Sequence, residues 1–301
     1  MKVAIYIARL LLVVLLVAAG ILLIFQHRMI YFPRPYGATL KAWLPVGASE
    51  IEYSTSEGAQ CAFYLPAASS APKRIWVAFG GNSALALDWC DFIERDENHG
   101  DAFLLIDYPG YGKCQGAASP EAIAESGRVA MEIVAKKLGQ NSAELHWNVI
   151  GHSLGCGAAL EFAVQRRVER VVLAAPFTSL RAMAQRAVGF PLCFVLLHNF
   201  DNRARLADLA KSAHPPLVTV FHGSADEVIP VDMSRSLARE FPELIKYHEV
   251  AGAEHNSIMS EAERELLQAM NQGVLPGVES AIPPDPNINE IRPRRRSPRG
   301  E

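Results

Sequence analysis

Short apolar runs, each bounded by glycine, proline or polar residues, recur along the chain and predict buried strands. Their near-continuous hydrophobic character is typical of a parallel sheet that is covered on both faces. Ahead of them, residues 49–65 alternate loosely around Ser56-Glu57-Gly58, which predicts an antiparallel hairpin at the beginning of the sheet. The runs occupy residues 75–79, 103–106, 147–150, 171–174, 217–221 and 246–250.

Helical patterns occupy the intervals between these runs. Ser119 is suited to be an N-cap and Pro120 the first helical residue of a helix that continues to about Leu138. An alanine-rich helical pattern also follows the strand at 147–150. Strands that alternate with helices predict the α/β class, with a mostly parallel sheet and helices on both of its faces.

The N-terminus is the most apolar part of the chain. Residues 10–25 are uncharged and almost wholly aliphatic, but they are slightly short for a complete span of the hydrocarbon core. Residues 3–25 are long enough, with a single interruption at Arg9, whose side chain can reach the headgroups. We therefore expect residues 1–28 to form a membrane anchor that contacts the bilayer through residues 3–25.

A cleaved signal peptide is the alternative for this segment. Lys2 and Arg9 would supply its basic region, and residues 17–20 its small-residue cleavage site. The apolar character continues through residues 21–25, beyond that site. The sequence therefore favours an uncleaved anchor, and both alternatives place the segment in or across a membrane.

Basic residues lie on both sides of the apolar stretch, so the positive-inside rule does not fix its orientation. A short leading segment is easily retained in the cytoplasm. We expect a single-pass signal-anchor with the rest of the chain on the non-cytoplasmic side of the membrane.

The C-terminal segment has a different composition from the rest of the chain. Residues 273–301 are rich in proline and include the basic cluster 292–299. This composition predicts disorder. Contact with anionic lipid is one function for such a cluster, but a solvated tail without a specific partner is the simpler interpretation.

Composition narrows the classes of protein that fit. Of the 301 residues, 50% are hydrophobic, which suffices for a buried sheet. Residues 29–272 are large for one domain but normal for a single α/β domain. A net charge of −3 gives no indication of a nucleic-acid partner. The five cysteines lack C-x-x-C spacing, so neither a zinc site nor a disulfide framework is indicated. The oligomeric state stays open.

The motif that indicates catalysis is Gly151-His152-Ser153-Leu154-Gly155. It lies between an apolar strand and a helical pattern. A serine on such a sharp strand-to-helix turn projects its hydroxyl from the sheet edge, as a nucleophile requires. Two candidate partners, an acid and then a histidine, follow in the chain order that is typical of a serine on such a turn. Asp226 comes after the run 217–221, and His255 after the run 246–250. Glu227, next to Asp226, is a less favoured choice for the acid.

Another turn supplies donors for a developing oxyanion. Gly80-Gly81-Asn82 follows the strand 75–79 and can present a backbone N–H, and Leu154 offers a second N–H at the start of the helix that follows Ser153. The turn 107–112 is interpreted as structural, as are His152 and His222.

Seven motifs in register now make a resemblance specific. The chain resembles the α/β-hydrolases, and more narrowly the membrane-anchored Bem46-type serine hydrolases, over roughly residues 31–270. The motifs are YFPRP, FGGN, DYPGYG, GHSLG, APFTSL, HGSADEVIP and GAEHN.

The resemblance implies a doubly wound α/β-hydrolase fold with a catalytic triad of Ser153, Asp226 and His255, and with backbone oxyanion donors at Asn82 and Leu154. It also implies that residues of about 180–214, which carry a partly apolar helical pattern, form a small cap over the site.

The chain departs from the family's pattern at two positions. Gly80 stands where such proteins usually have histidine, so any contact of that imidazole is lost, although the backbone donor at Asn82 should survive. Cys114 stands where serine is more usual, which is interpreted as an exchange of small residues.

The predicted function is hydrolysis of an acyl ester or thioester through an acyl-enzyme, with no metal and no organic cofactor. The substrate is expected to be a small-molecule or lipid-like acyl compound. A membrane-tethered serine peptidase is one alternative. A non-catalytic membrane-anchored binding module is another, although a binding role gives no reason to keep all three triad residues.

Overall fold

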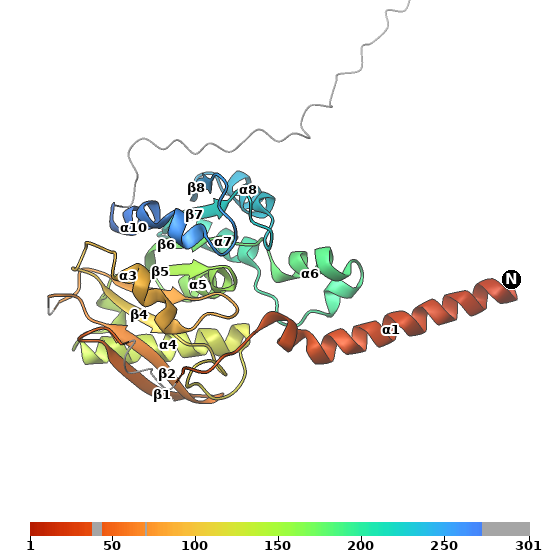
Figure 1. Ribbon diagram of the computed structural model, residues 1–301, viewed down its shortest axis with the longest axis horizontal. Coiled ribbons are helices and arrows are strands. Elements are labelled where there is room, and N and C mark those ends of the chain that lie inside the picture. The colour runs from red at the N-terminus through yellow and green to blue at the C-terminus, as the bar shows by residue number, and fades with distance from the viewer. Residues whose placement is uncertain (38–43, 70, 273–301) are drawn as a thin grey trace, which may run out of the picture.

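The computed structural model describes residues 1–37, 44–69 and 71–272. The predicted C-terminal tail, 273–301, therefore lies outside the described residues. Within them the chain forms an eight-stranded sheet in the order β1-β2-β4-β3-β5-β6-β7-β8 (Figure 1). The strands are β1 (Ser49–Thr55), β2 (Gly58–Leu65), β3 (Ile75–Phe79), β4 (Ala102–Ile106), β5 (Trp147–His152), β6 (Val168–Ala174), β7 (Leu217–Gly223) and β8 (Ile245–Val250).

The predicted mostly parallel sheet is confirmed. β3 to β8 pair in parallel, while the β1–β2 hairpin lies at one edge and joins β4 in antiparallel fashion. Every apolar run identified in the sequence is a strand. The parallel strands all end at the same edge of the sheet, so the loops that follow β3, β5, β7 and β8 meet there.

Two hydrophobic cores lie on the two faces of the sheet because side chains alternate along each strand. Val77 and Phe79 of β3 belong to one core, with α4, α5, α7 and α8. Trp76 and Ala78 of the same strand belong to the other, with η1, α3, α9 and α10. These helices are η1 (Ala86–Trp89), α3 (Cys90–Ile93), α4 (Pro120–Lys137), α5 (Leu154–Gln165), α7 (Asn202–Ala210), α8 (Val231–Glu240), α9 (Ile258–Glu261) and α10 (Glu263–Gln272).

The longest of these helices begins as its sequence predicts. The Ser119 hydroxyl accepts a hydrogen bond from the Ala122 N–H at 3.0 Å, and Pro120 is the first residue of α4. The cap satisfies a donor that the helix itself cannot pair. α4 ends at Lys137, next to Leu138. A 3-10 turn, η2 (Ser142–Glu144), then leads into β5.

The segment predicted as a cap divides into two parts. α6 (Leu180–Val188) and the 3-10 helix η3 (Leu192–Val195) stand out from the sheet towards α1 (Figure 1). α7 instead returns to the body, where Leu206 and Leu209 are buried in the core. The projecting part is thus α6 and η3.

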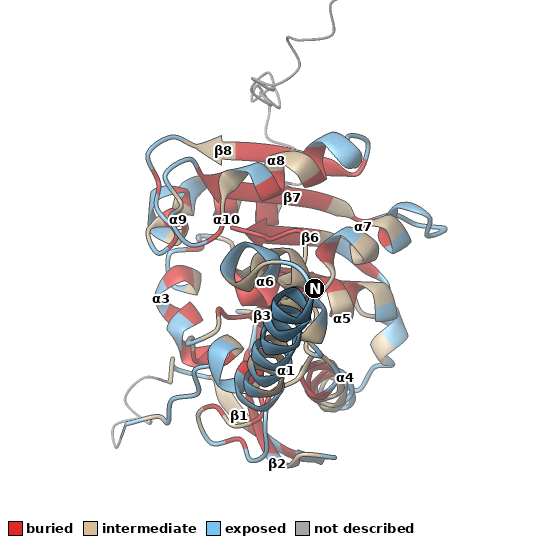
Figure 2. Cartoon of the chain, turned by 90° about the vertical axis from the view of Figure 1, so that its right-hand side faces the viewer, coloured by how far each residue is buried: buried red, intermediate tan, exposed pale blue. Residues whose placement is uncertain are grey.

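The apolar N-terminal stretch is a single helix, α1 (Lys2–Ile30), whose most apolar 18-residue window has a mean hydropathy of 3.0. By length and composition it can cross a membrane. It extends away from the body and most of its surface is exposed (Figures 1 and 2). Its C-terminal turns contact η3. This last contact brings an apolar helix next to the loops at the carboxyl edge of the sheet.

Candidate active site

Ser153 occupies a strained turn between β5 and α5. Its φ of 55° and ψ of −120° are rare for a residue with a side chain. The flanking glycines make the turn possible. A Cβ on Gly155 would lie 2.0 Å from the Phe79 carbonyl oxygen, and one on Gly151 would lie 2.4 Å from the Gly155 oxygen. Close packing of α5 on β3 therefore holds the Ser153 hydroxyl at the sheet edge.

The structure brings the three residues predicted from sequence order into one hydrogen-bonded chain. His255 Nε2 lies 2.9 Å from Ser153 Oγ, and His255 Nδ1 lies 2.8 Å from Asp226 Oδ2. A carboxylate only accepts, so Nδ1 carries the proton and Nε2 is free to accept the one on the serine hydroxyl. Ser153 and His255 are buried. The arrangement can deprotonate the hydroxyl and keep the resulting imidazolium stable.

Asp226 is held as an anion by its surroundings. Burial opposes its ionisation, but hydrogen bonds from His222, His255 and the Ile229 N–H outweigh that effect and hold the pKa of Asp226 well below its usual range. Its Oδ1 accepts from the N–H groups of Val228 at 2.9 Å and Ile229 at 2.7 Å. The carboxylate is thus fixed in place as well as ionised.

Glu227 is the less favoured candidate for the acid. The hydrogen bond that its carboxylate forms with His255 is to the backbone N–H, at 3.5 Å. Of the two acids, Asp226 is the one whose carboxylate lies within hydrogen-bond distance of the imidazole.

His222 is a second imidazole on the same carboxylate. Its Nε2 lies 3.2 Å from Asp226 Oδ2 and 2.9 Å from the Ile229 carbonyl oxygen. Its Nδ1 lies 2.6 Å from the Ser234 hydroxyl, which donates to the Pro176 carbonyl. The His222 side chain is fully buried. This histidine was interpreted as structural, and the sequence carried no signal that it shares Asp226.

His152 forms a hydrogen bond with the loop that carries His255. Burial, reinforced by neighbouring His255, lowers the pKa of His152 to about 4, so its ring is neutral at neutral pH. Its Nε2–H donates to the His255 carbonyl oxygen at 3.2 Å. The two rings lie 5.2 Å apart. His152 therefore positions the backbone of His255 and has no hydrogen bond to Ser153.

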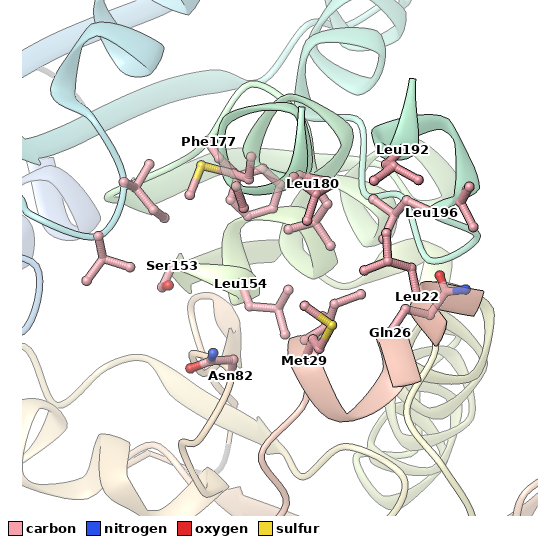
Figure 3. A pocket seen from close by; sticks show the side chains of 18 residues that line it. Leu22, Gln26, Met29, Asn82, Ser153, Leu154, Phe177, Leu180, Leu192 and Leu196 are labelled. Atoms are coloured by element: carbon pink, nitrogen blue, oxygen red, sulfur yellow. The ribbon is translucent and has the colours of Figure 1, made fainter. Parts of the chain in front are cut away.

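Asn82 and Leu154, predicted as oxyanion donors, line one cavity together with Ser153 (Figure 3). Leu154 is the first residue of α5, where a backbone N–H has no helical partner. Leu154, at the start of α5, and Asn82, on the loop after β3, thus both lie beside the hydroxyl. Both N–H groups can be aimed at an oxyanion formed there.

The glycine turn before Asn82 is held by two tyrosines of the DYPGYG motif. The Tyr108 hydroxyl donates to the Gly80 carbonyl at 2.6 Å, and the Tyr111 hydroxyl donates to the Asn82 carbonyl at 2.5 Å. A side chain at Gly80 would approach the Ala84 Cβ at 2.7 Å. The Gly80 and Asn82 carbonyls belong to the peptides on either side of the one that carries the Asn82 N–H. The turn 107–112, which is predicted to be structural, therefore holds the backbone on both sides of that N–H.

The cavity has a volume of about 290 Å³, and none of the described residues that line it carries a charge. Leu180 and Met183 of α6 and Leu192 of η3 form part of its wall. Leu22 and Met29 of α1 form another part, which sequence reasoning missed. In Figure 3 Ser153 lies towards one side of the cavity, and Leu22 and Leu192 lie towards the other.

Within residues 1–37, 44–69 and 71–272, no group of three or more His, Cys, Asp or Glu side chains is arranged to hold a metal ion. All five cysteines belong to this part of the chain, and all are free and buried. Cys114, at the position where serine is usual, accepts from the Cys61 N–H at 3.2 Å and donates to the Cys61 carbonyl at 3.4 Å.

The sheet order defines the class of the protein as an α/β-hydrolase fold, in which Ser153, His255 and Asp226 have the arrangement of a catalytic triad. The chain is 30% identical over 250 residues to the uncharacterized protein Rv2307c of Mycobacterium tuberculosis, a match that covers 81% of this chain and 86% of that protein. It belongs to the same family as that protein. No protein-family model matches the chain.

Solved structures agree with this class at the level of the fold. The esterase PF2001 of Pyrococcus furiosus superposes with a TM-score of 0.59 at 12% identity, and covers 80% of this chain and 95% of its own. The esterase domain of a Rhodothermus marinus protein gives a TM-score of 0.54 at 14% identity, with 75% and 96% covered.

Proposed function

We propose that this protein is a serine hydrolase that cleaves an acyl ester or thioester, and that it is a membrane-anchored hydrolase of the Bem46 type. The observation that carries the proposal is the hydrogen-bonded chain from Ser153 through His255 to Asp226 beside an uncharged, largely apolar cavity. The esterases with the same fold support the reaction class.

In the proposed reaction His255 takes the proton of the Ser153 hydroxyl as the oxygen attacks the acyl carbonyl. The N–H groups of Asn82 and Leu154 stabilise the oxyanion. His255 then gives its proton to the leaving group, and an acyl-enzyme remains. A water molecule, deprotonated by the same imidazole, releases the acid. Asp226 stays ionised throughout and stabilises the imidazolium.

The alternatives have less support. A peptidase that recognises a peptide amine needs a charged pocket, whereas none of the described residues around this cavity is charged. A binding module has no use for the backbone strain at Ser153, which costs on the order of 1–3 kcal/mol. That strain serves a nucleophile, because it presents the hydroxyl to a substrate.

We assign α1 to the membrane as an uncleaved signal-anchor. Cleavage near residues 17–20 would leave a new N-terminus with Ile21, Leu23, Ile24 and Phe25 largely exposed to water. Exposure of apolar side chains to water costs free energy, and a bilayer that covers these side chains removes that cost. With a short leading segment retained in the cytoplasm, the hydrolase domain lies on the non-cytoplasmic side. Protection of the domain from protease in sealed vesicles tests this orientation.

A fluorophosphonate probe tests the reaction class. The full-length protein in detergent should be labelled and should hydrolyse para-nitrophenyl acetate, whereas Ser153→Ala should lose the label and at least about 10⁴-fold in kcat. Equal labelling of the variant would refute Ser153 as the nucleophile. A panel of aminoacyl amides distinguishes a peptidase from an esterase, because only a peptidase should cleave them.

A further inference from the structure

We propose that α1 is a wall of the active site as well as an anchor, and that the substrate is a long-chain ester residing in the bilayer, whose acyl chain enters between α1 and η3. This inference rests on the proposed hydrolase function and names its substrate class. In this proposal the membrane helix and the cap together form the binding site for the acyl chain.

One face of α1 lines the cavity. Leu22, Gln26, Met29 and Ile30 line it, and their spacing of four, seven and eight residues places them on the same side of a helix. From Leu22 to Ile30 this face extends by roughly 12 Å at 1.5 Å per residue. The cavity therefore follows the last two turns of α1, in the direction in which the helix leaves the protein (Figures 1 and 3).

Gln26 attaches the helix to the cap. It is the one buried residue of α1, with 6% of its surface exposed. Its Oε1 accepts from the Leu197 N–H at 2.7 Å, and its Nε2 donates to the Leu23 carbonyl at 3.2 Å. A buried amide with both ends paired holds two elements in one geometry. α1 and the segment after η3 are therefore fixed relative to each other.

The chain directly after α1 continues this attachment to the oxyanion turn. The Phe32 N–H donates to the Asn82 carbonyl at 2.9 Å. Arg34 Nε donates to the Ser83 carbonyl at 2.8 Å. The wall formed by α1 and the proposed oxyanion donor are thus parts of one connected unit.

The cap exposes apolar side chains next to this wall. Phe190, Phe194 and Leu197 are 76%, 61% and 71% exposed, and η3, which carries Phe194, contacts α1. On α1 itself Ile24 is 74% exposed. The occupant of this surface is the bilayer, because the surface is continuous with a helix whose length and composition suit a membrane span.

The depth of the cavity fits this occupant. α1 carries no Lys, Arg, Asp or Glu between Arg9 and Arg28, so its last turn marks the headgroup level. Leu22 then lies on the hydrocarbon side of that level. An acyl chain can pass from the leaflet along Leu22 towards Ser153 without exposing its methylenes to water, which would be unfavourable. The ester carbonyl then meets the hydroxyl near the interface.

The test uses full-length protein reconstituted in phosphatidylcholine vesicles and compares para-nitrophenyl dodecanoate with para-nitrophenyl acetate. Leu22→Trp should lower the ratio of the two kcat/KM values by at least about tenfold, since an indole occupies space needed only by the longer chain. Leu16→Trp is the matched control, because Leu16 is exposed on the same helix and does not line the cavity. It should leave both values unchanged.

Val195→Trp repeats the test from the η3 wall, in case Leu22→Trp fails to fold. An unchanged ratio in a variant that still reacts with fluorophosphonate would overturn the proposal. A wild-type protein that neither reacts with the probe nor cleaves acetate would instead refute the proposed function.

A second measurement tests where the substrate is taken from. Dioleoylglycerol in the same vesicles is diluted with phosphatidylcholine at constant bulk concentration. As the mole fraction of dioleoylglycerol in the membrane is lowered, the rate of its hydrolysis should fall. A rate that follows bulk concentration alone would contradict entry from the bilayer.

Discussion

The backbone N–H of Phe32, two residues after the end of α1, donates a hydrogen bond to the carbonyl oxygen of Asn82 at 2.9 Å. The Tyr111 hydroxyl bridges the same two residues, since it accepts from the Phe32 N–H at 2.9 Å and donates to the Asn82 carbonyl at 2.5 Å. Asn82, whose N–H is the proposed oxyanion donor, is therefore held through its carbonyl by the segment that follows the apolar helix.

Tyr111→Phe should lower kcat for ester hydrolysis by about tenfold with little change in KM, because the loosened Asn82 N–H stabilises the transition state less well. Loss of the hydroxyl should also reduce the free energy of unfolding by about 1 kcal/mol. Steady-state kinetics and urea unfolding in detergent measure both. Tyr53→Phe is the control, since the Tyr53 hydroxyl bonds buried Ser126 at 2.7 Å. It should lose stability and keep kcat; a matching loss of kcat would mean that the effect is not specific to Asn82.

Asp226→Asn should lower kcat by about 10⁴-fold, because an amide favours the wrong tautomer of His255 and leaves the imidazolium without a counter-charge. Glu227→Gln should change kcat by less than about threefold, since the hydrogen bond between Glu227 and His255 is to the backbone N–H and leaves the imidazole in place. Rates of para-nitrophenyl acetate hydrolysis decide between them. If the Glu227 variant were the more impaired, the acid would have been assigned to the wrong residue.

His222→Gln should make the activity more sensitive to acid. A hydrogen bond from His222 helps to hold the pKa of Asp226 low against the effect of burial, so its loss raises that pKa. As pH falls, Asp226 is then protonated at a higher pH than in the wild type, and this second proton makes the acid limb of kcat/KM steeper at a higher pH. A pH–rate profile that extends down to about pH 3 measures where the steeper decline begins. A uniform loss at every pH would point to a merely structural role.

The partly buried His152 should make folding pH-dependent. Its pKa is about 4 when folded and near 6.5 when unfolded, so between these values the unfolded chain binds more protons. Its contribution to stability is complete above pH 6.5 and is lost as pH falls towards 4. Between pH 7.5 and 4.5 this amounts to about 2–3 kcal/mol.

Urea unfolding of the wild type and of His152→Gln at both pH values isolates this contribution. Burial also lowers the pKa of His248 to about 4, but His248 is present in both proteins and cancels in the comparison. The variant should lose less stability on acidification than the wild type does. An equal loss in both proteins would show that His152 is not the group responsible.

Local patterns were sufficient to predict the sheet and the order of the site residues. Buried strands have continuous apolar runs, and the glycines at 151 and 155 are part of a strand-turn-helix pattern that is visible in the sequence. The contact that requires Gly155, with the Phe79 carbonyl of β3, is visible only in the structure. Since parallel strands end at a common edge, placing Ser153, Asp226 and His255 after three such strands predicted that they would meet. These inferences needed only the chain order and the geometry of parallel strands.

The sequence by itself thus determined the α/β architecture, the positions of Ser153, Asp226 and His255 after strands that end at one edge of the sheet, and the presence of an apolar N-terminal helix. Only the tertiary structure decided that His222 shares Asp226 and that one face of α1 lines the cavity beside Ser153. The physical reason is that an aliphatic side chain is equally suited to lipid and to a protein pocket. Its hydrophobicity predicts burial, but the surface that covers it is decided by packing between segments far apart in the chain.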